Sequence, residues 1–399
     1  MINLDLTFLP LILAACSVIE FIIGFLLPRA QGILSIAAGI IISAMAFMGI
    51  FTAVDTLSIG ILLVSLTFTF ISVGSIRDHE DNKLYYPCLS AVGALSLGFL
   101  ISNELILKLI LWETVWIPVF IILLLSKERK LSVLFSKLWF LSEALIISSF
   151  ILMQNKADQN LVFWLMISGL LIRIWAFPFD VLVKKTVAQC SFHISSVVGV
   201  LLPILPIFFA IQVIQPAFQN ELGHFYEIIS WVFISGIIVW AIRLAVDANV
   251  NTLVSSQIVI FNSIVGLCLT NTSDVFLKAV LEIIFVKTLI NILITFYGDE
   301  TKTNSRTWMF AIPVITAFGI PGIIIGIPLL TLISGWYAVD PAISISILIL
   351  LMACFAYSSV IITPLFASRH GIKLNFKTSA FILLFTFIIA SSLFFSRGF

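Results

Sequence analysis

Charged residues are scarce in this chain of 399 residues: Asp, Glu, Lys and Arg make up 10% of it, whereas hydrophobic residues make up 61%. Such a composition, with a mean hydropathy of +1.20, excludes an ordinary soluble domain. The formal net charge of +1 gives no electrostatic basis for binding nucleic acid. Long polar stretches are missing as well, so we expect no separate soluble domain. The composition predicts an all-α polytopic membrane protein.

Motifs for metals, redox groups and nucleotides are also missing. The five cysteines are scattered, mostly inside apolar runs, and show no CxxC or Cys/His spacing that would indicate a metal site, an iron–sulfur cluster or a disulfide framework. There is no Walker loop, no GxGxxG after a strand, no Ser/His/Asp arrangement and no haem or quinone ligand set. We therefore expect no cofactor and no redox or hydrolytic chemistry in this chain. Whether the chain is a subunit of a larger enzyme stays open.

What the chain does have is a series of apolar runs of about 18–25 residues, the length that crosses a hydrocarbon core of ~30 Å. The first run follows a start without a basic region, so it is predicted to be a span and not a cleaved signal peptide. We count about fourteen spans, with approximate limits 7–28, 32–53, 56–75, 85–102, 105–126, 136–153, 161–183, 192–214, 226–246, 252–270, 275–297, 307–335, 339–366 and 378–397.

The loop charges predict the orientation of these spans. Loops after odd-numbered spans carry most of the basic residues: Arg29, Arg77, Lys83, Lys127, Arg129, Lys130, Lys184, Lys185, Lys302, Arg306, Arg369, Lys373 and Lys377. The other loops and the termini carry little more than Lys156 and Arg397. Because cytoplasmic loops are enriched in Lys and Arg, both termini are predicted to face away from the cytoplasm, in a bacterial inner membrane.

Two of the spans are interrupted. The seventh lies within Leu161 to Gln189, carries Arg173 near its middle and is broken by Pro178. The twelfth is broken at the run Gly319, Ile320, Pro321 and Gly322, and again at Pro328. Broken helices at corresponding positions of two halves are typical of inverted repeats with a transport site near the midplane.

The breaks predict the internal organisation of a single membrane domain. The first repeat holds spans four to eight (85–214) and the second holds spans nine to thirteen (226–366). An N-terminal segment of three helices (1–84) and a last helix (378–397) lie outside the two repeats. Each broken helix is then the fourth of its repeat, and an odd number of helices per repeat makes the two copies inverted.

An ionisable residue inside a span is a functional-site hypothesis by default. Glu113 in the fifth span needs a cationic partner or a proton, which suits either a proton relay or a structural pair with a neighbouring helix. Lys287 and Glu282 in the eleventh span leave the same two alternatives open. Arg173 can hold a carboxylate but cannot hand on a proton, because a guanidinium stays charged. Glu143 in the sixth span is a further buried acid.

Other ionisable residues are weaker candidates. Asp180 follows the break of the seventh span, and His193 lies beyond it, where it either titrates or is a hydrogen-bonded structural residue. Asp247 lies four residues after Arg243, a spacing that favours a local ion pair. Glu20 in the first span shows no organised partner, so a structural role is favoured.

Six motifs, in matching order and spacing, resemble the antiporter-like membrane subunits of respiratory complex I, of multi-subunit cation/proton antiporters and of membrane-bound hydrogenases. They are the run Asn103 to Pro118 with Glu113; Ser136-Lys137; Arg173 to Asp180 with Pro178; Asp247 with Leu253, Ser255 and Ser256; Phe285-Val-Lys287; and Gly319 to Gly322. The resemblance covers most of spans four to thirteen.

In that family a Glu on the fifth helix pairs with a Lys on the seventh, and further charged residues continue a polar axis across the membrane centre. The resemblance gives Glu113 the first role and Lys287 a central one. This chain departs from the pattern in several ways, one of them after the seventh-helix break, where the run from Asp180 to Lys184 stands in place of the family's His-x-Trp-Leu-Pro. Arg173 replaces the seventh-helix Lys, and the positions expected to be charged on the eighth and twelfth helices fall near Val197 to Pro203 and near Leu329, which are not ionisable.

The resemblance implies a subunit of a larger ion-pumping membrane complex that moves protons, or exchanges Na⁺ for protons. The residues assigned to the ion path are Glu113, Arg173, Glu143, Glu282 and Lys287. Its partners would be other membrane subunits, the lipid bilayer and the transported ion. The alternatives are a structural or anchoring subunit that no longer conducts, and the membrane subunit of an inorganic-carbon uptake system.

Overall fold

The structure is a computed structural model. It describes residues 8–52, 56–75, 83–126, 128–247, 250–270 and 340–351, together with positions 277, 280, 281, 283, 284, 288, 290, 333 and 335–337. The predicted path residues Glu282 and Lys287 lie outside the described residues, as do the predicted breaks at Gly319, Pro321, Gly322 and Pro328.

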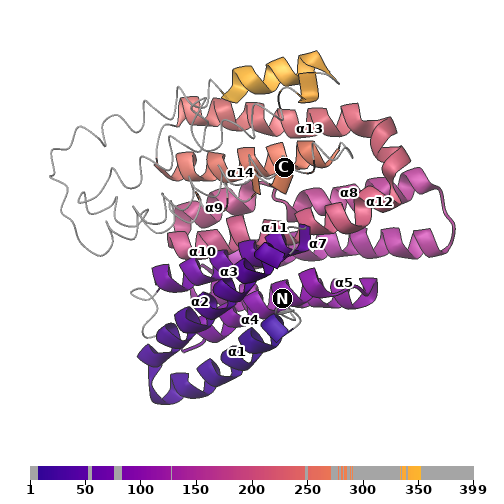
Figure 1. Cartoon of the computed structure of the whole chain (residues 1–399). Helices are drawn as coiled ribbons and strands as arrows, with labels where there is room; N and C mark the ends of the chain where they lie inside the picture. Colours follow the sequence, from indigo (N-terminus) through magenta and orange to yellow (C-terminus); the bar gives the residue numbers. More distant parts are fainter. Residues whose placement is uncertain are drawn as a thin grey trace. The chain divides into compact units, whose positions relative to one another are not determined.

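Every regular element in the described ranges is helical (Figure 1). The elements are α1 (Leu9–Leu26), α2 (Pro28–Thr52), α3 (Thr56–Ser75), α4 (Tyr85–Ile101), α5 (Leu105–Thr114), α6 (Trp116–Leu125), α7 (Arg129–Gln154), α8 (Gln159–Arg173), α9 (Val181–Gln189), α10 (Phe192–Ser196), the π-helical turn η2 (Val197–Leu201), α11 (Leu202–Phe209), the π-helical turn η3 (Ala210–Ile214), α12 (Gln215–Ala217), α13 (Gln219–Val246) and α14 (Val250–Leu269).

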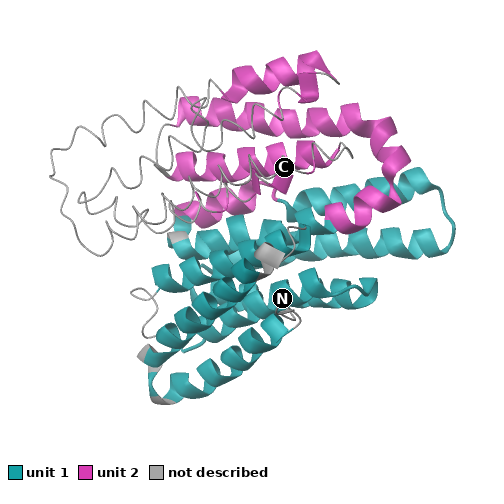
Figure 2. Cartoon of the chain, in the orientation of Figure 1, with its two compact units in different colours: residues 1–174, 189–209 teal, residues 175–188, 210–399 magenta. Residues whose placement is uncertain are grey.

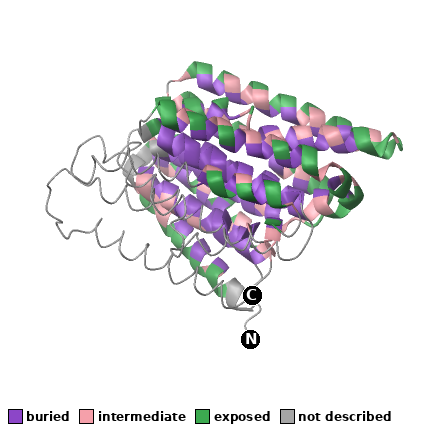
Figure 3. Ribbon diagram, turned by 90° about the horizontal axis from the view of Figure 1, so that it is seen from above, coloured by how far each residue is buried: buried purple, intermediate pink, exposed green. Residues whose placement is uncertain are grey.

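Seven of the described helical segments are long and apolar enough to cross a membrane. The protein is therefore an integral, multi-pass, all-α membrane protein, as its composition predicts. The outer helices expose large apolar side chains, such as Ile106 on α5, Ile151 on α7 and Ile242 on α13. Figure 3 shows exposed positions of this kind in green beside buried positions in purple. Lipid or neighbouring protein covers such surfaces.

The chain forms two compact units (Figure 2). Unit 1 comprises residues 1–174 and 189–209, and unit 2 comprises residues 175–188 and 210–399. In unit 1, α1 packs against α2 and α4, α2 packs against α3, and α7 packs along α8. In unit 2, α13 packs along α14. Each unit thus has helix pairs with extensive side-to-side contact.

The fifth predicted span is interrupted near its middle. It forms α5 and α6, with Val115 between them. Pro118 has no N–H, so it cannot donate to the carbonyl of Thr114, four residues earlier. The Val115 N–H donates instead to the Trp112 carbonyl, three residues back (3.3 Å), which tightens the turn. Glu113 therefore lies in the last turn of a half-helix, a feature that the expectation of one continuous span over 105–126 did not contain.

The seventh span is also divided. Its first half, α8, ends at Arg173, and α9 begins at Val181. The intervening segment holds Pro178, whose bond to Phe177 is cis, and Trp175, whose φ of 56° is left-handed. Helix α13 approaches this segment closely, because a Cβ on Gly236 would lie 3.0 Å from the Phe177 Cβ. The break thus places Arg173 at the C-terminus of a helix.

The eighth span contains two π-helical turns, where the sequence predicts a continuous helix. Pro203 and Pro206 remove the N–H groups that would bond the carbonyls of Gly199 and Leu202. The π-helical turn η2 precedes this stretch and η3 follows α11. Proline and π-turns are common causes of local irregularity in spanning helices. The stretch from Val197 to Ala210 is buried throughout.

Candidate functional site

Arg173 and Glu113 form a buried ion pair in unit 1. The Arg173 Nη2 lies 2.8 Å from both Oε1 and Oε2 of Glu113. The Arg173 residue is 2% exposed, whereas the side chain of Glu113 is 20% exposed. The guanidinium is thus enclosed by protein, while the carboxylate keeps one side open. Two half-helices end at this pair, α5 at Thr114 and α8 at Arg173.

Helix α7 supplies the hydrogen bonds around the pair. The Trp139 Nε1 donates to Glu113 Oε2 (3.0 Å), and the Arg173 Nε donates to Ser142 Oγ (2.9 Å). The Ser142 hydroxyl in turn donates to the carbonyl of Gly169 on α8 (2.8 Å). Because Trp139 and Ser142 are three residues apart, they share one face of α7. That face fixes the orientation of both charged groups.

Two tryptophan rings enclose the guanidinium. The Arg173 Cζ lies 3.7 Å from the ring centroid of Trp139 and 4.7 Å from that of Trp112. Trp112 also packs against Phe99 and Phe209. Stacking on aromatic faces stabilises a desolvated cation by about 2 kcal/mol in favourable cases. Arg173 Nη1 is buried and has no hydrogen-bond partner among the described groups, so the rings are its main contact on that side.

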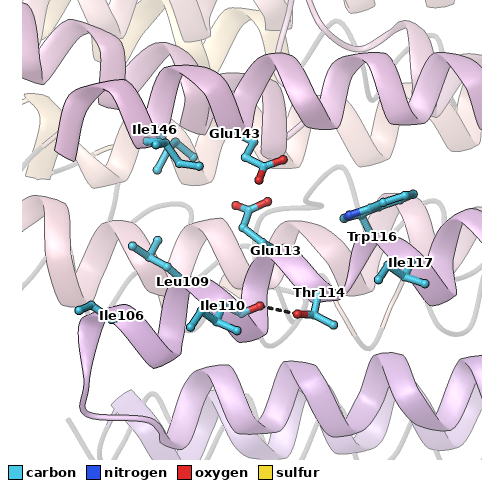
Figure 4. A pocket seen from close by; sticks show the side chains of 10 residues that line it. Ile106, Leu109, Ile110, Glu113, Thr114, Trp116, Ile117, Glu143 and Ile146 are labelled. Atoms are coloured by element: carbon cyan, nitrogen blue, oxygen red, sulfur yellow. Dashed lines mark hydrogen bonds between the residues drawn. The ribbon is translucent and has the colours of Figure 1, made fainter. Parts of the chain in front are cut away.

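A second carboxylate faces this pair. In Figure 4 the carboxyl groups of Glu113 on α5 and Glu143 on α7 point toward each other across a groove. The groove has a volume of about 480 Å³ and is lined by Ile106, Leu109, Ile110, Glu113, Thr114, Trp116, Ile117, Glu143, Ile146 and Ile147. When both acids are ionised, they and the single guanidinium carry one net negative charge. One proton is therefore enough to neutralise the cluster.

Asp180 belongs to a separate ion pair in unit 2. Its Oδ2 lies 2.5 Å from Nη1 of Arg243 on α13, and Asp180 is 1% exposed. The Arg243 Cζ lies 4.8 Å above the ring of Trp240. The Asp180 carbonyl accepts the first backbone hydrogen bond of α9, from Lys184 N. Asp180 thereby links the start of α9 to α13.

The remaining candidates have local hydrogen-bond partners. Asp247 Oδ2 accepts from the hydroxyl of Thr252 on α14 (3.0 Å). The buried His193 ring lies 2.8 Å from Ser191 Oγ and packs edge-on against Tyr85. Among the residues that the structure describes, no three His, Cys, Asp or Glu side chains lie close enough to hold a metal ion.

Sequence reasoning singled out the charged residues of the site but assigned no role to Trp112, Trp139 and Ser142. Trp112 lies in the motif Asn103 to Pro118 and Trp139 in the motif that begins at Ser136, although neither indole was expected to contact the guanidinium. Ser142 carried no signal, because serine is an ordinary residue in a spanning helix. The helical spacing of positions 139, 142 and 143 could have indicated this polar face, because it places an indole donor, a hydroxyl group and an acid on one side of the helix.

Comparison with protein-family models found no match, and none of the curated proteins is detectably similar in sequence. Solved structures do match. A subunit of respiratory complex I from Thermus thermophilus aligns with a TM-score of 0.79 and 14% identity, over 98% of this chain and 97% of that one. A subunit of the Mrp complex from a Dietzia species aligns with a TM-score of 0.79 and 13% identity, over 92% and 81%.

A subunit of the membrane-bound sulfane sulfur reductase, an archaeal respiratory membrane complex, aligns with a TM-score of 0.77 and 11% identity, over 96% of this chain and 94% of that one. The chain has the fold of these membrane subunits. The resemblance inferred from the six motifs is thus confirmed as a likeness of fold. At identities of this order the likeness concerns the fold alone, and function has to be argued from the site.

Proposed function

We propose that this chain is an antiporter-like membrane subunit of a larger ion-pumping complex, and that it translocates protons or exchanges Na⁺ for protons. The observation that carries the proposal is the buried pair of Arg173 and Glu113 with Glu143 opposite. Charged groups at membrane depth are costly and are typical of ion pathways. The similar structures, all of which are subunits of multi-subunit membrane complexes, support a role inside such an assembly.

The chemistry of the cluster suits proton movement over a short distance. Arg173 is a permanent cation, so it attracts the carboxylates without competing for the proton. When a proton binds Glu113, the guanidinium loses its counter-charge and acts on Glu143 instead. When the proton leaves, the pair forms again. Protonation of one carboxyl group thereby changes the electrostatic potential at the other carboxyl group, on the opposite side of the groove.

The proposal includes the wider architecture predicted by the sequence. About fourteen spans form two inverted repeats (85–214 and 226–366), broken at helices seven and twelve. The path then continues from Glu143 to Glu282 and Lys287, and both termini lie on the non-cytoplasmic side of a bacterial inner membrane. Ile106 and Ile117 line the groove beside Glu113 and are exposed, so lipid or a partner subunit would cover them in the assembled complex.

The test is the replacement of Glu113 by Gln in the assembled complex, assayed in sealed vesicles. Glutamine keeps an acceptor for Trp139 Nε1 but cannot exchange a proton, so transport driven by ΔpH should be abolished. Glu104→Gln is the matched control, because Glu104 begins the same helix, is exposed and makes no capping hydrogen bond from its side chain. Unchanged transport in the Glu113→Gln vesicles contradicts the relay.

A second function is favoured by a different observation. The buried stretch from Val197 to Pro203 offers no ionisable side chain where the family has a basic residue, and Arg173 cannot release a proton. A structural subunit that no longer conducts accounts for both features. It predicts that Glu113→Gln leaves transport unchanged, whereas Arg173→Leu, which leaves the carboxylate unpaired, lowers the amount of assembled complex.

A further inference from the structure

A second cluster of buried polar groups lies among α1, α2, α3 and α4, all in unit 1. Its centre is the carboxyl group of Glu20 on α1. Ser35 on α2, Ser72 on α3 and Ser90 on α4 lie around it, and all four residues are 0% exposed. The surrounding positions of these helices are mainly apolar. Four helices thus direct one acid and three hydroxyl groups into the interior of one bundle.

The contacts of the Glu20 carboxyl group are incomplete. Cys16 Sγ donates to Oε1 (3.3 Å). The hydroxyl groups of Ser35 and Ser90 face the carboxyl group, and Ser35 Oγ lies 3.0 Å from Ser72 Oγ. Yet Glu20 Oε2 and Ser90 Oγ are both buried without a hydrogen bond of normal geometry to any described group. The Cys16 thiol is thus the one described side chain that donates to this carboxyl group with normal geometry.

No cation neutralises this acid among the described side chains. Cys16 on the same helix is a neutral thiol. Lys83, in the loop before α4, places its Nζ over the ring of Phe25, 5.2 Å from the centroid. Tyr86 on α4 lies with its hydroxyl 3.4 Å from Ser75 Oγ on α3. The described side chains packed around Glu20 therefore contribute hydroxyl groups, a thiol and a phenol, but no positive charge at the carboxyl group.

We propose that Glu20 is a proton-binding site, at which the carboxyl group is held as the neutral acid. An ionised carboxylate without a counter-charge in an apolar interior is strongly disfavoured. A single proton removes that charge, and the neutral acid can both donate and accept hydrogen bonds. The site is separate from the Glu113 and Arg173 pair, so it goes beyond the proposed ion path.

Polar atoms connect this site to one end of the bundle. The Gln31 Nε2 donates to the backbone carbonyl of Glu20 (2.5 Å) and to that of Lys83 (2.9 Å), which lies in the loop between α3 and α4. Glu20 is six residues from the end of α1 at Leu26, about 9 Å at the rise of an α-helix. The end of the bundle that holds the Lys83 loop is therefore the nearer one for proton exchange.

Infrared difference spectroscopy of the full chain in lipid nanodiscs, titrated with pH, tests this assignment. The carbonyl stretch of a protonated, weakly solvated carboxylic acid should be present at neutral pH and disappear only in alkaline buffer. Glu20→Gln should remove that band, and Glu104→Gln, a control at an exposed acid that lies in neither site, should leave it in place. Cys16→Ala should shift its frequency, because the thiol donates to Oε1; this variant keeps the test valid if Glu20→Gln does not fold.

Three outcomes overturn the proposal. One is the absence of the band from the wild-type spectrum at neutral pH, which means that Glu20 is ionised. Another is a Glu20→Gln spectrum identical to that of the wild type. The third is loss of the band on adding NaCl but not choline chloride at constant pH, which assigns the site to a metal cation. A failure of Glu113→Gln to affect transport has no bearing on this band, so the two proposals are tested separately.

Discussion

Replacing Arg173 by methionine removes the guanidinium but keeps an unbranched side chain of similar length. The change leaves Glu113 facing the vacated site without its counter-charge. Removal of one partner of a buried ion pair costs about 3–5 kcal/mol, because the remaining charge is uncompensated. The Glu113 side chain is 20% exposed, which places the expected loss near the lower end of that range. A loss of about 3 kcal/mol lowers the folding equilibrium constant by roughly a hundredfold.

The double variant Glu113→Gln/Arg173→Met separates this electrostatic effect from lost packing. Removing both charges of a buried pair is often nearly neutral for stability. Glutamine still offers Trp139 Nε1 an acceptor, so the indole is not left unsatisfied. We therefore expect the double variant to recover most of the stability that the single variant loses. Titration with SDS from mixed micelles, followed by circular dichroism, measures the three proteins on one scale.

The reasoning is refuted if Arg173→Met unfolds at the same SDS fraction as the wild type, since the pair would then contribute nothing to stability. It is equally refuted if the double variant is as unstable as the single one, because the loss would then come from packing against Trp112 and Trp139 alone.

Three further changes test neighbouring contacts. Trp139→Phe removes the indole donor to Glu113 but keeps an aromatic ring over the cation, and should cost about 1–3 kcal/mol in the same SDS titration. Arg243→Met leaves the buried Asp180 unpaired and should lower the melting temperature more than Asp180→Asn does, which thermal unfolding measures. Gly236→Ala places a methyl group 3.0 Å from the Phe177 Cβ and should destabilise the protein by about 1–3 kcal/mol, also measured by thermal unfolding.

The outcomes that contradict these three expectations differ. For Trp139→Phe it is unchanged stability, which would mean that water replaces the indole at the carboxylate. For Arg243→Met it is a smaller effect than that of Asp180→Asn. For Gly236→Ala it is a rise in the melting temperature, as expected if the added methyl group fills space and the glycine only lowers helix propensity.

Local chemistry explains which parts of this fold the sequence predicts. Apolar runs specify membrane helices directly, and Pro178 marks a break because proline acts on its own backbone neighbourhood. Pro118 did not indicate a break, since proline is tolerated in the first turn of a helix; here it lies in the first turn of α6 because the chain turns at Val115. The π-helical turns around Pro203 and Pro206 carry no comparable signal, because they depend on how the helix packs.

The residues of the candidate site also differ in how directly the sequence predicts them. An acid or a guanidinium inside a span is visible in the sequence because it is unusual there. The Trp139 donor and the Ser142 hydroxyl lie 34 and 31 residues from Arg173 in sequence, and only the packing of α7 along α8 brings them to the guanidinium. The sequence showed Glu20 as an acid inside a span but not the hydroxyl groups near it, because these come from three other helices.

The end of α8 at Arg173 has an electrostatic consequence for the buried guanidinium. The aligned peptide dipoles of a helix leave about half a negative charge at its C-terminus, which stabilises a cation in the last turn. Arg173 therefore has two counter-charges, the carboxylate and the helix end. A helix end contributes up to about 2 kcal/mol to holding such a cation in the interior. The break after α8 thus adds a fixed partial charge beside Arg173, which stays in place whatever the charge of the Glu113 side chain.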